Sequence, residues 1–116
     1  TDLHYSESSE IRLPLLWIAL LYGKVSLSLA ATTGVQSAVE VVKYLMAGAD
    51  VVMTASSLYK NGIPYLKTMN KELQAWMYTM GFDCIDKFKG SMSQQHISDP
   101  TAYERANYIK ILEGVK

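Results

Sequence analysis

Two runs of small residues are the positions in this sequence best suited to binding a ligand. Thr32-Thr33-Gly34 follows one apolar segment, and Ala55-Ser56-Ser57 follows a second. Small side chains let backbone N–H groups approach an anion closely, and the first turn of a following helix presents further unpaired N–H groups. The spacing also fits a simple turn at Gly34 and serine caps of helices. At the level of spacing, both interpretations remain open.

Other polar residues indicate chemistry more weakly. Ser93, His96 and Asp99 have the residue types of a catalytic triad, but they lie close together in one polar loop, and nothing in the pattern brings them into the required geometry. His4, His96 and Cys84 lack the spacing of zinc ligands. The sequence also lacks the phosphate-loop and dinucleotide fingerprints. We therefore predict no catalytic residue and no metal site from these groups, and a solvated loop around His96.

The elements that position the two runs are a pair of strands and the helix between them. Residues 25–31 alternate in hydrophobicity, and residues 50–55 are β-branched and apolar, so we predict strands over both segments. Ser37 and Gly48 are suited to cap the intervening helix. One face of that helix carries its apolar residues, Ala38, Val41, Val42, Leu45, Met46 and Ala49. This strand–helix–strand length predicts a βαβ unit with parallel strands.

Further helices flank this unit. Pro14 marks a helix that ends before Gly23 and is expected to be buried on most sides. Residues 57–60 fit one helical turn, and Pro64 opens a long helix that ends at Gly81. Residues 99–100, Asp-Pro, predict a last helix that reaches about residue 112.

Composition limits the classes of protein to consider. The chain has 116 residues, of which 49% are hydrophobic, so it is one small domain or part of a larger one. Eleven basic residues balance eleven acidic ones, which argues against a nucleic-acid partner. The apolar run 13–22 is about half of the ~20 residues that a membrane span needs. We expect a soluble, cytoplasmic protein that does not bind membranes.

Two parallel strands do not make a stable sheet by themselves, because parallel pairs normally lie inside larger sheets covered by helices. We therefore expect an α/β fold in which this chain is the C-terminal segment of a (β/α)8 TIM barrel, incomplete as a barrel by itself. Residues 1–90 would form the barrel part and residues 91–116 a helical extension. The absence of an initiator Met before Thr1 agrees with preceding polypeptide. The alternative is a free-standing α/β interaction domain that self-associates or binds a protein through uncovered strand edges.

Several segments, taken in order, resemble the C-terminal part of the dihydroorotate dehydrogenase family. The resemblance covers roughly residues 11–90. It rests on Thr33-Gly34-Val35, the turn 48–50, residues 52–58, the Asn-Gly pair 61–62 and the stretch 81–90, Gly-Phe-Asp-Cys-Ile-Asp-Lys-Phe-Lys-Gly. Each piece is short, but their order and spacing together are specific.

The resemblance implies an FMN-dependent oxidoreductase that oxidises dihydroorotate or a related small molecule in pyrimidine biosynthesis. Thr33 and Gly34 match the turn whose amides bind the FMN phosphate, with Val35 packed beneath it. Ala55 and Ser56 match the small and hydroxyl residues that complete that site. Thr33 and Ala55 stand where the family usually has glycine, and their Cβ atoms narrow the room for close backbone approach.

The family's catalytic base, a Cys or Ser, belongs to a loop after an earlier strand, so the resemblance implies no catalytic residue in this chain. Cys84 does not match that base. We therefore expect an inactive fragment of an enzyme. Its expected partners are the remainder of the barrel or another copy of the chain, which would make a homo-oligomer, and a small-molecule substrate in the complete protein.

Overall fold

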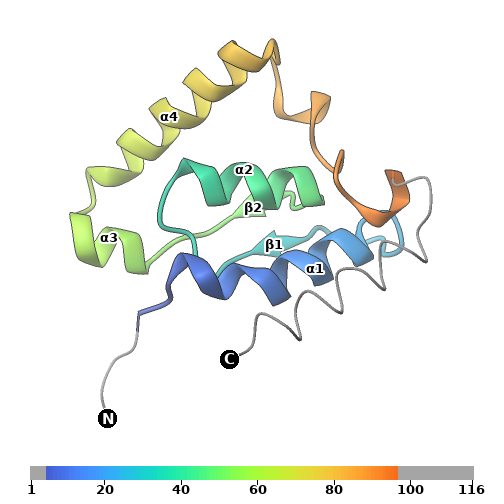
Figure 1. Cartoon of the computed structure of the whole chain (residues 1–116), viewed down its shortest axis with the longest axis horizontal. Coiled ribbons are helices and arrows are strands. Elements are labelled where there is room, and N and C mark those ends of the chain that lie inside the picture. Colours follow the sequence, from blue (N-terminus) through green and yellow to red (C-terminus); the bar gives the residue numbers. More distant parts are fainter. Residues whose placement is uncertain (1–4, 97–116) are drawn as a thin grey trace.

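A helix joins two short parallel strands at the centre of the chain (Figure 1). The computed structural model describes residues 5–96. Strand β1 is Ala30–Ala31 and strand β2 is Val51–Val52, paired in register as Ala30 with Val51 and Ala31 with Val52. The predicted parallel βαβ unit is confirmed. The other elements, in chain order, are η1 Ser8–Ile11, α1 Arg12–Leu21, α2 Ala38–Ala47, α3 Ser56–Asn61, α4 Tyr65–Met80, η2 Ile85–Lys87 and η3 Gln94–His96.

Both strands are shorter than the predicted segments 25–31 and 50–55. A strand is defined by the hydrogen bonds that it exchanges with a neighbour. Within residues 5–96 the sheet has two strands, so the alternating residues 25–29 have no further strand to pair with. Three more backbone bonds flank the pair. Asp50 N and Val51 N donate to Leu29 O over 2.7 and 3.3 Å, and Met53 N donates to Ala31 O over 2.8 Å.

Helix α2 begins and ends where the sequence predicts. Ser37 caps its start in a capping box with Glu40, and Gly48 follows its last turn at φ 125°. From the predicted face, Ala38, Val42, Leu45 and Ala49 are buried. Tyr44, which the apolar periodicity does not include, is the most deeply buried large side chain of this helix, with 0% exposure.

Residues 88–93 close the end of α2. Gly90 N donates to Leu45 O over 2.9 Å and Met92 N to Met46 O over 2.8 Å, which satisfies carbonyls that the last turn of a helix leaves unpaired. The Tyr22 ring lies between Gly48 and Gly90, and a Cβ atom at either glycine would overlap it. This contact connects the end of α1 to both segments.

Helix α1 is less buried than predicted, and α4 is buried at one residue. In α1, Ile18 and Ala19 are buried, whereas Trp17 is 54% and Leu13 51% exposed. In α4, Met69 is buried against the core, but Met80 at its end is exposed. A helix at the surface of a fold buries one face alone, so the apolar composition of α1 overstates its burial. Among residues 5–96 no helix has both the length and the hydropathy to cross a membrane.

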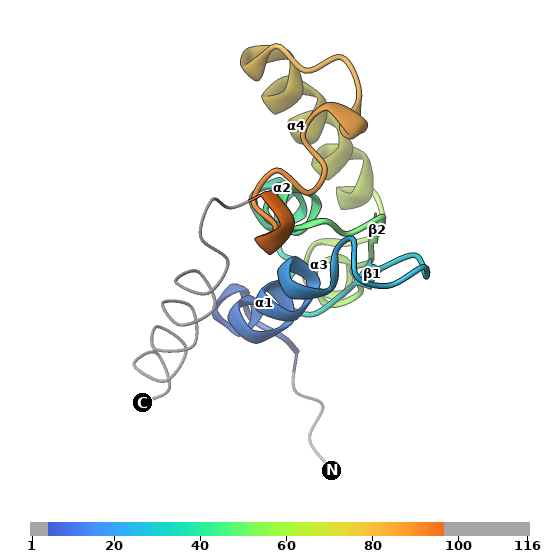
Figure 2. The same cartoon turned by 90° about the vertical axis from the view of Figure 1, so that its right-hand side faces the viewer.

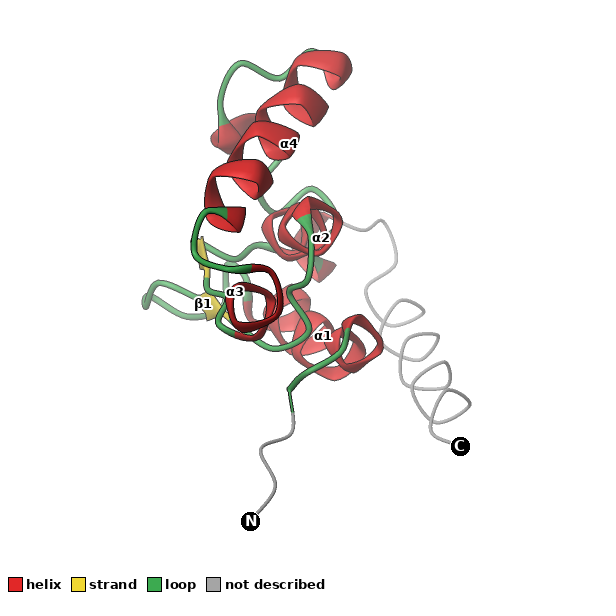
Figure 3. Ribbon diagram, turned by 90° about the vertical axis from the view of Figure 1, so that its left-hand side faces the viewer, coloured by secondary structure: helices red, strands yellow, loops and turns green. Residues whose placement is uncertain are grey.

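The helices α1 and α2 both lie on one side of the strand pair, and α4 extends away from it (Figures 2 and 3). Ala31 faces these helices and is buried, with Val52 packed against the same cluster. The register pair Ala30 and Val51 is exposed on the other side. The described part of the chain is therefore an α/β arrangement, mostly helical, with an open two-stranded sheet. The last helix predicted from Asp99 falls outside the described residues, as does most of the extension 91–116.

Candidate functional site

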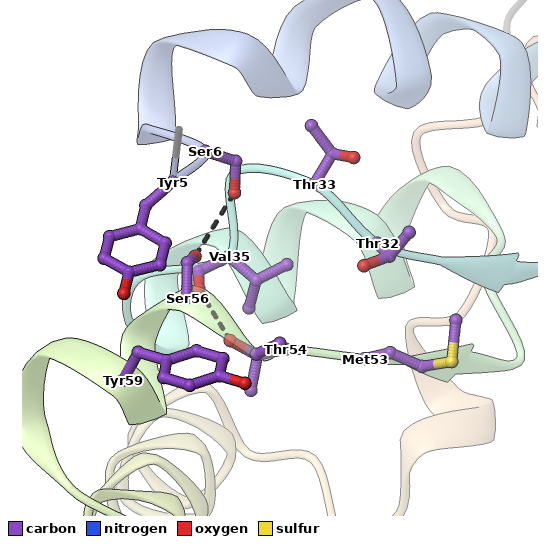
Figure 4. Close-up of a pocket in the computed structure, with 10 residues that line it drawn as sticks. Tyr5, Ser6, Thr32, Thr33, Val35, Met53, Thr54, Ser56 and Tyr59 are labelled. Carbon is purple, nitrogen blue, oxygen red and sulfur yellow. Dashed lines mark hydrogen bonds between the residues drawn. The ribbon is translucent and has the colours of Figure 1, made fainter. Parts of the chain in front are cut away.

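An open hollow of about 330 Å³ lies where the chain leaves β1 and β2 (Figure 4). It receives residues from the segment before η1, from the turn after β1 and from the start of α3. Thr33, Val35, Ala55 and Ser56 of the predicted site line it, and Gly34 lies in the same turn. The remaining lining residues are Tyr5, Ser6, Thr32, Met53, Thr54 and Tyr59.

The turn at Thr33-Gly34 has an unusual backbone. Both residues have positive φ angles, 85° at Thr33 and 76° at Gly34, and Thr33 is the non-glycine residue with this conformation among those described. A Cβ atom on Gly34 would lie 2.9 Å from the carbonyl oxygen of Glu7 and 3.1 Å from the amide nitrogen of Ile11. Glycine is therefore required here because the segment 7–11 passes directly over the turn.

Ser6 connects the two predicted halves of the site. The Gly34 N–H donates to Ser6 Oγ over 3.0 Å, and Ser6 Oγ is hydrogen-bonded to Ser56 Oγ at 3.2 Å. The Gln36 side-chain amide donates to Ser56 Oγ and to the Ser6 carbonyl, both over 2.8 Å. Gly34 and Ser56, 22 positions apart in the sequence, thus share one hydroxyl partner.

Sequence reasoning missed Ser6 and Gln36 as parts of this cluster. Both lie in segments without periodic patterning, and Ser6 is 50 positions from Ser56. The one available signal was the serine-rich composition of residues 6–9, which by itself is typical of a connector. No local pattern indicates that this connector folds back over the turn after β1.

Thr54 ties the end of β2 to the same turn. Its hydroxyl donates to the Val35 carbonyl over 2.9 Å and is hydrogen-bonded to Ser57 Oγ at 2.6 Å (Figure 4 shows the bond to Val35). Val35 itself is buried beneath the turn, as its packing role predicts. Ala55 is exposed and directly precedes α3. These contacts hold the two loops at the same end of the strand pair.

Tyr44 supports the turn from the core side. Its hydroxyl donates to the carbonyl oxygens of Thr32 and Thr33, at 2.9 and 2.8 Å, which share its single proton. Burial raises the pKa of Tyr44 to about 12, so the hydroxyl stays protonated and keeps its role as donor at physiological pH.

Two tyrosine rings border the outer end of the hollow. Tyr5 and Tyr59 stack with ring centroids 5.6 Å apart and an angle of 13° between their planes. The lining contains hydroxyl, amide and aromatic groups and no Lys, Arg, Asp or Glu side chain. The exposed Lys60 belongs to α3 but does not line the hollow. The donors available to a ligand here are therefore neutral.

The other polar residues singled out by sequence form no second site within the described range. Ser93, expected in a solvated loop, is instead buried, and its hydroxyl donates to the Gly90 carbonyl over 2.7 Å. His96 is exposed near Tyr22, and Asp99 falls outside the described residues. Cys84 is exposed. Across residues 5–96, no three His, Cys, Asp or Glu side chains are grouped to hold a metal ion.

Comparison with known proteins identifies relatives of part of this chain. A probable dihydroorotate dehydrogenase A (fumarate) of Enterococcus faecalis is 27% identical over 71 residues, which is 61% of this chain and 23% of that protein. The dihydroorotate dehydrogenase (fumarate) of Saccharomyces cerevisiae is 29% identical over 62 residues, 53% of this chain and 20% of the enzyme. The chain is similar to part of dihydroorotate dehydrogenase (fumarate).

A third dihydroorotate dehydrogenase, the putative A (fumarate) protein of Streptococcus equi subsp. equi, is 28% identical over 67 residues, 58% of this chain and 22% of that protein. The matched segment thus spans about a fifth of the length of these dihydroorotate dehydrogenases. No family model matches the chain. The similarity supports the resemblance found in the sequence, which is to part of a dihydroorotate dehydrogenase.

Proposed function

We propose that this chain is part of an FMN-dependent oxidoreductase related to dihydroorotate dehydrogenase and that the hollow binds the FMN phosphate. The proposed binding residues are Thr33, Gly34, Val35, Ala55 and Ser56. The observation that carries the proposal is the meeting of the Gly34 amide and the Ser56 hydroxyl at one point, the Ser6 hydroxyl.

The residues around the hollow fit a phosphate group. Phosphate oxygens accept hydrogen bonds, and the hollow is lined by the hydroxyls of Ser6 and Ser56, next to the Gly34 amide. The Ser6 and Ser56 hydroxyls share one hydrogen bond, which uses one of their two protons and leaves the other available to an acceptor. Neutral donors of this kind recurrently hold phosphates in α/β proteins.

When bound, FMN would supply the redox chemistry by accepting a pair of electrons and a proton, formally a hydride, from the substrate. The part of this chain in that reaction is to hold the phosphate end and fix the cofactor's position. We propose that the catalytic base, the remaining barrel strands and the contacts to dihydroorotate or a related substrate come from polypeptide beyond these residues. The matched share of the dihydroorotate dehydrogenases, about a fifth, supports this division.

A flavin-binding titration tests this function. The fluorescence of FMN and of riboflavin, which lacks the phosphate, is followed as the chain is added. We expect FMN to bind at least about tenfold more tightly than riboflavin, because several hydrogen bonds to a charged group are made only with FMN. Equal affinity for the two flavins, or no binding of either, would refute the proposed phosphate site.

A matched pair of glycine variants tests whether the preference for FMN over riboflavin depends on the turn at Gly34. Gly34→Ala places a Cβ against Glu7 and Ile11 and should remove the preference for FMN. Gly81→Ala introduces the same side chain at a similar φ, 81°, where nothing lies within 4 Å of the added atom. This control should keep the preference. A Gly34→Ala chain that still prefers FMN would place the phosphate elsewhere.

A second candidate function is association through the open sheet. Val51 of β2 is 53% exposed, and Leu27, in the loop before β1, is 78% exposed. Among the described residues, helices cover one side of the strand pair (Figures 2 and 3). Exposed apolar side chains on unpaired strands favour pairing with further polypeptide. We propose that this surface meets the remainder of a barrel or a second copy of the chain.

A further inference from the structure

The buried side chain of Tyr44 contacts the site turn from the core side, opposite the groups that would touch a phosphate. Tyr44 lies in the middle of α2 with 0% exposure, and its hydroxyl is the polar atom that it brings into an otherwise apolar core. A buried hydroxyl needs a hydrogen-bond partner, and leaving one unpaired is costly. The partners of this hydroxyl are the carbonyl oxygens of Thr32 and Thr33 in the site turn.

The bond to Thr33 bears directly on the Gly34 amide because both groups belong to one peptide unit. The peptide bond is planar and trans, so its C=O and N–H point in opposite directions. Tyr44 holds the Thr33 carbonyl toward the core at 2.8 Å. The Gly34 N–H must therefore point away from the core, toward Ser6 Oγ on the wall of the hollow, as its 3.0 Å bond shows.

This peptide needs an external constraint. Thr33 is β-branched and sits at φ 85°, in a region that non-glycine residues occupy at a cost of about 1–2 kcal/mol. The strained φ angle belongs to the peptide between Thr32 and Thr33, whose carbonyl accepts one bond from Tyr44. Rotation of the next peptide, between Thr33 and Gly34, would turn the Gly34 N–H away from Ser6. The bond from Tyr44 to the Thr33 carbonyl opposes this rotation.

We propose that Tyr44 is a positioning residue for the anion site, which aims the Gly34 N–H into the hollow by holding the Thr33 carbonyl. It touches no ligand and acts through one peptide unit. The inference rests on the proposed phosphate site for its functional consequence, but the aim of the Gly34 N–H is a property of the free chain.

Amide NMR on the ¹⁵N-labelled chain tests the proposal, with inorganic phosphate as the probe. We compare the wild type with Tyr44→Phe, which removes the hydroxyl alone. The matched control is Tyr65→Phe, because the Tyr65 hydroxyl also donates to a backbone carbonyl, that of Gln36 at 2.8 Å, but not to the Thr33–Gly34 peptide. Urea unfolding of all three chains records the stability that each hydroxyl contributes.

We expect Tyr44→Phe to weaken phosphate binding about tenfold, the value of one hydrogen bond to a charged group, and to speed hydrogen exchange of the Gly34 amide without phosphate. Tyr65→Phe should leave both quantities within about twofold of the wild type. Wild-type affinity and exchange at Gly34 in Tyr44→Phe would overturn the proposal. The proposal would also be overturned if both variants lost phosphate affinity and Gly34 protection equally, in proportion to their loss of stability. That result would show a purely structural role for the Tyr44 hydroxyl.

The two proposals can fail separately. If the wild-type Gly34 resonance does not shift when phosphate is added, the phosphate site is refuted. Hydrogen exchange of the Gly34 amide in the wild type and in Tyr44→Phe still decides the role of Tyr44. If Tyr44→Phe does not fold, the proposal is tested by an NMR titration of the wild-type chain with phosphate. The Tyr44 Cζ resonance should then shift with the same phosphate midpoint as the Gly34 amide, because polarisation passes through the shared peptide. An unchanged Cζ resonance at saturating phosphate would overturn the assignment.

Discussion

At the scale of single residues, the site turn combines a strained threonine with a glycine that no other residue can replace. Thr33 and Gly34 both have positive φ, but for different reasons. Gly34 is hemmed in by backbone atoms of Glu7 and Ile11, whereas the Thr33 side chain is half-buried at the edge of the hollow. The contacts that fix Thr33 come from its carbonyl, which accepts from Tyr44. The threonine side chain is therefore not needed for the turn itself.

Thr33→Gly should stabilise the chain. Glycine removes a penalty of about 1–2 kcal/mol at this φ and adds about 0.5–1 kcal/mol of backbone entropy cost, which leaves a gain of roughly 0.5–1 kcal/mol in the free energy of unfolding. Urea unfolding measures it. Thr32→Gly, at an exposed neighbour without a positive φ, should lower that free energy instead. A loss of stability in Thr33→Gly would show that its side chain contributes more than its strain costs.

At the scale of elements, α2 connects the two loops of the site, and its first turn is capped by local side chains. The Glu40 carboxylate accepts from the backbone amides of Gln36 and Ser37 at 3.1 and 3.0 Å, and the Ser37 hydroxyl accepts from Val39 N at 3.3 Å. Gln36 is also the residue whose side chain binds Ser6 and Ser56. The start of this helix therefore contributes to stability and to the geometry of the site.

Ser37→Ala should lower the free energy of unfolding by about 1 kcal/mol, because one amide of the first turn loses its acceptor. Urea unfolding gives the value. Ser28→Ala, at an exposed position in the loop before β1, is the matched control and should change it by less than about 0.5 kcal/mol. Equal effects of the two substitutions would mean that the cap does not stabilise α2.

An ion pair ties the start of β2 to the segment after η2. Lys89 Nζ lies 2.9 Å from Asp50 Oδ1, and the Leu29 amide donates to Asp50 Oδ2 over 2.7 Å. The hydrogen bond from Lys89, and then the one from Leu29, hold the pKa of Asp50 below its ordinary value of 3.8. The same contact raises the pKa of Lys89.

This ion pair predicts a loss of stability in acid. Because the pKa of Asp50 is lower in the folded chain than in the unfolded one, its contribution is complete above about pH 4–5 and disappears as the pH falls below the unfolded value. For a pair this exposed it should amount to less than about 1 kcal/mol. Urea unfolding from pH 6 to pH 2 should therefore show a shallower decline for Asp50→Asn than for the wild type. Asp83→Asn, at an exposed position, should keep the wild-type slope.

At the scale of the whole molecule, the described residues leave one side of the strand pair uncovered. Val51 is exposed there, and Leu27 is exposed in the loop that leads into β1, while the helices on the other side bury Ala31. An isolated pair of parallel strands is uncommon, and parallel sheets are normally covered on both faces. This surface is where a barrel or a partner would complete the fold.

The combined substitution Leu27→Lys and Val51→Lys should weaken self-association of the chain. Two added charges on a strand surface oppose pairing with another copy. Sedimentation velocity over a range of concentrations measures the distribution of species. Tyr78→Lys, at a side chain that is 89% exposed on α4, is the matched control and should leave it unchanged. If the wild-type chain stays monomeric at every concentration, a second copy of the chain is not the partner of this surface.

The sequence by itself predicted the helices α1 to α4, the strand pair and their order, but not the 3-10 helices or the short length of the strands. The apolar face and capping residues predicted α2 with its bounds, the βαβ spacing predicted a parallel pair, and Gly34 and Gly48 marked turns that the structure contains. These features are encoded locally, because helix periodicity, caps and glycine turns depend on residues a few positions apart. The resemblance to dihydroorotate dehydrogenase likewise rests on short runs in a fixed order.

Only the tertiary structure decided which side chains meet at the site and which apolar faces are covered. Ser6 reaches Gly34 and Ser56 across 28 and 50 positions, and the Tyr44 hydroxyl lies behind the turn from the following helix. The same packing left Leu13 and Trp17 exposed although their helix, α1, is apolar. Such contacts depend on how the elements pack, and no periodicity within a segment specifies the partner that another segment will bring to it.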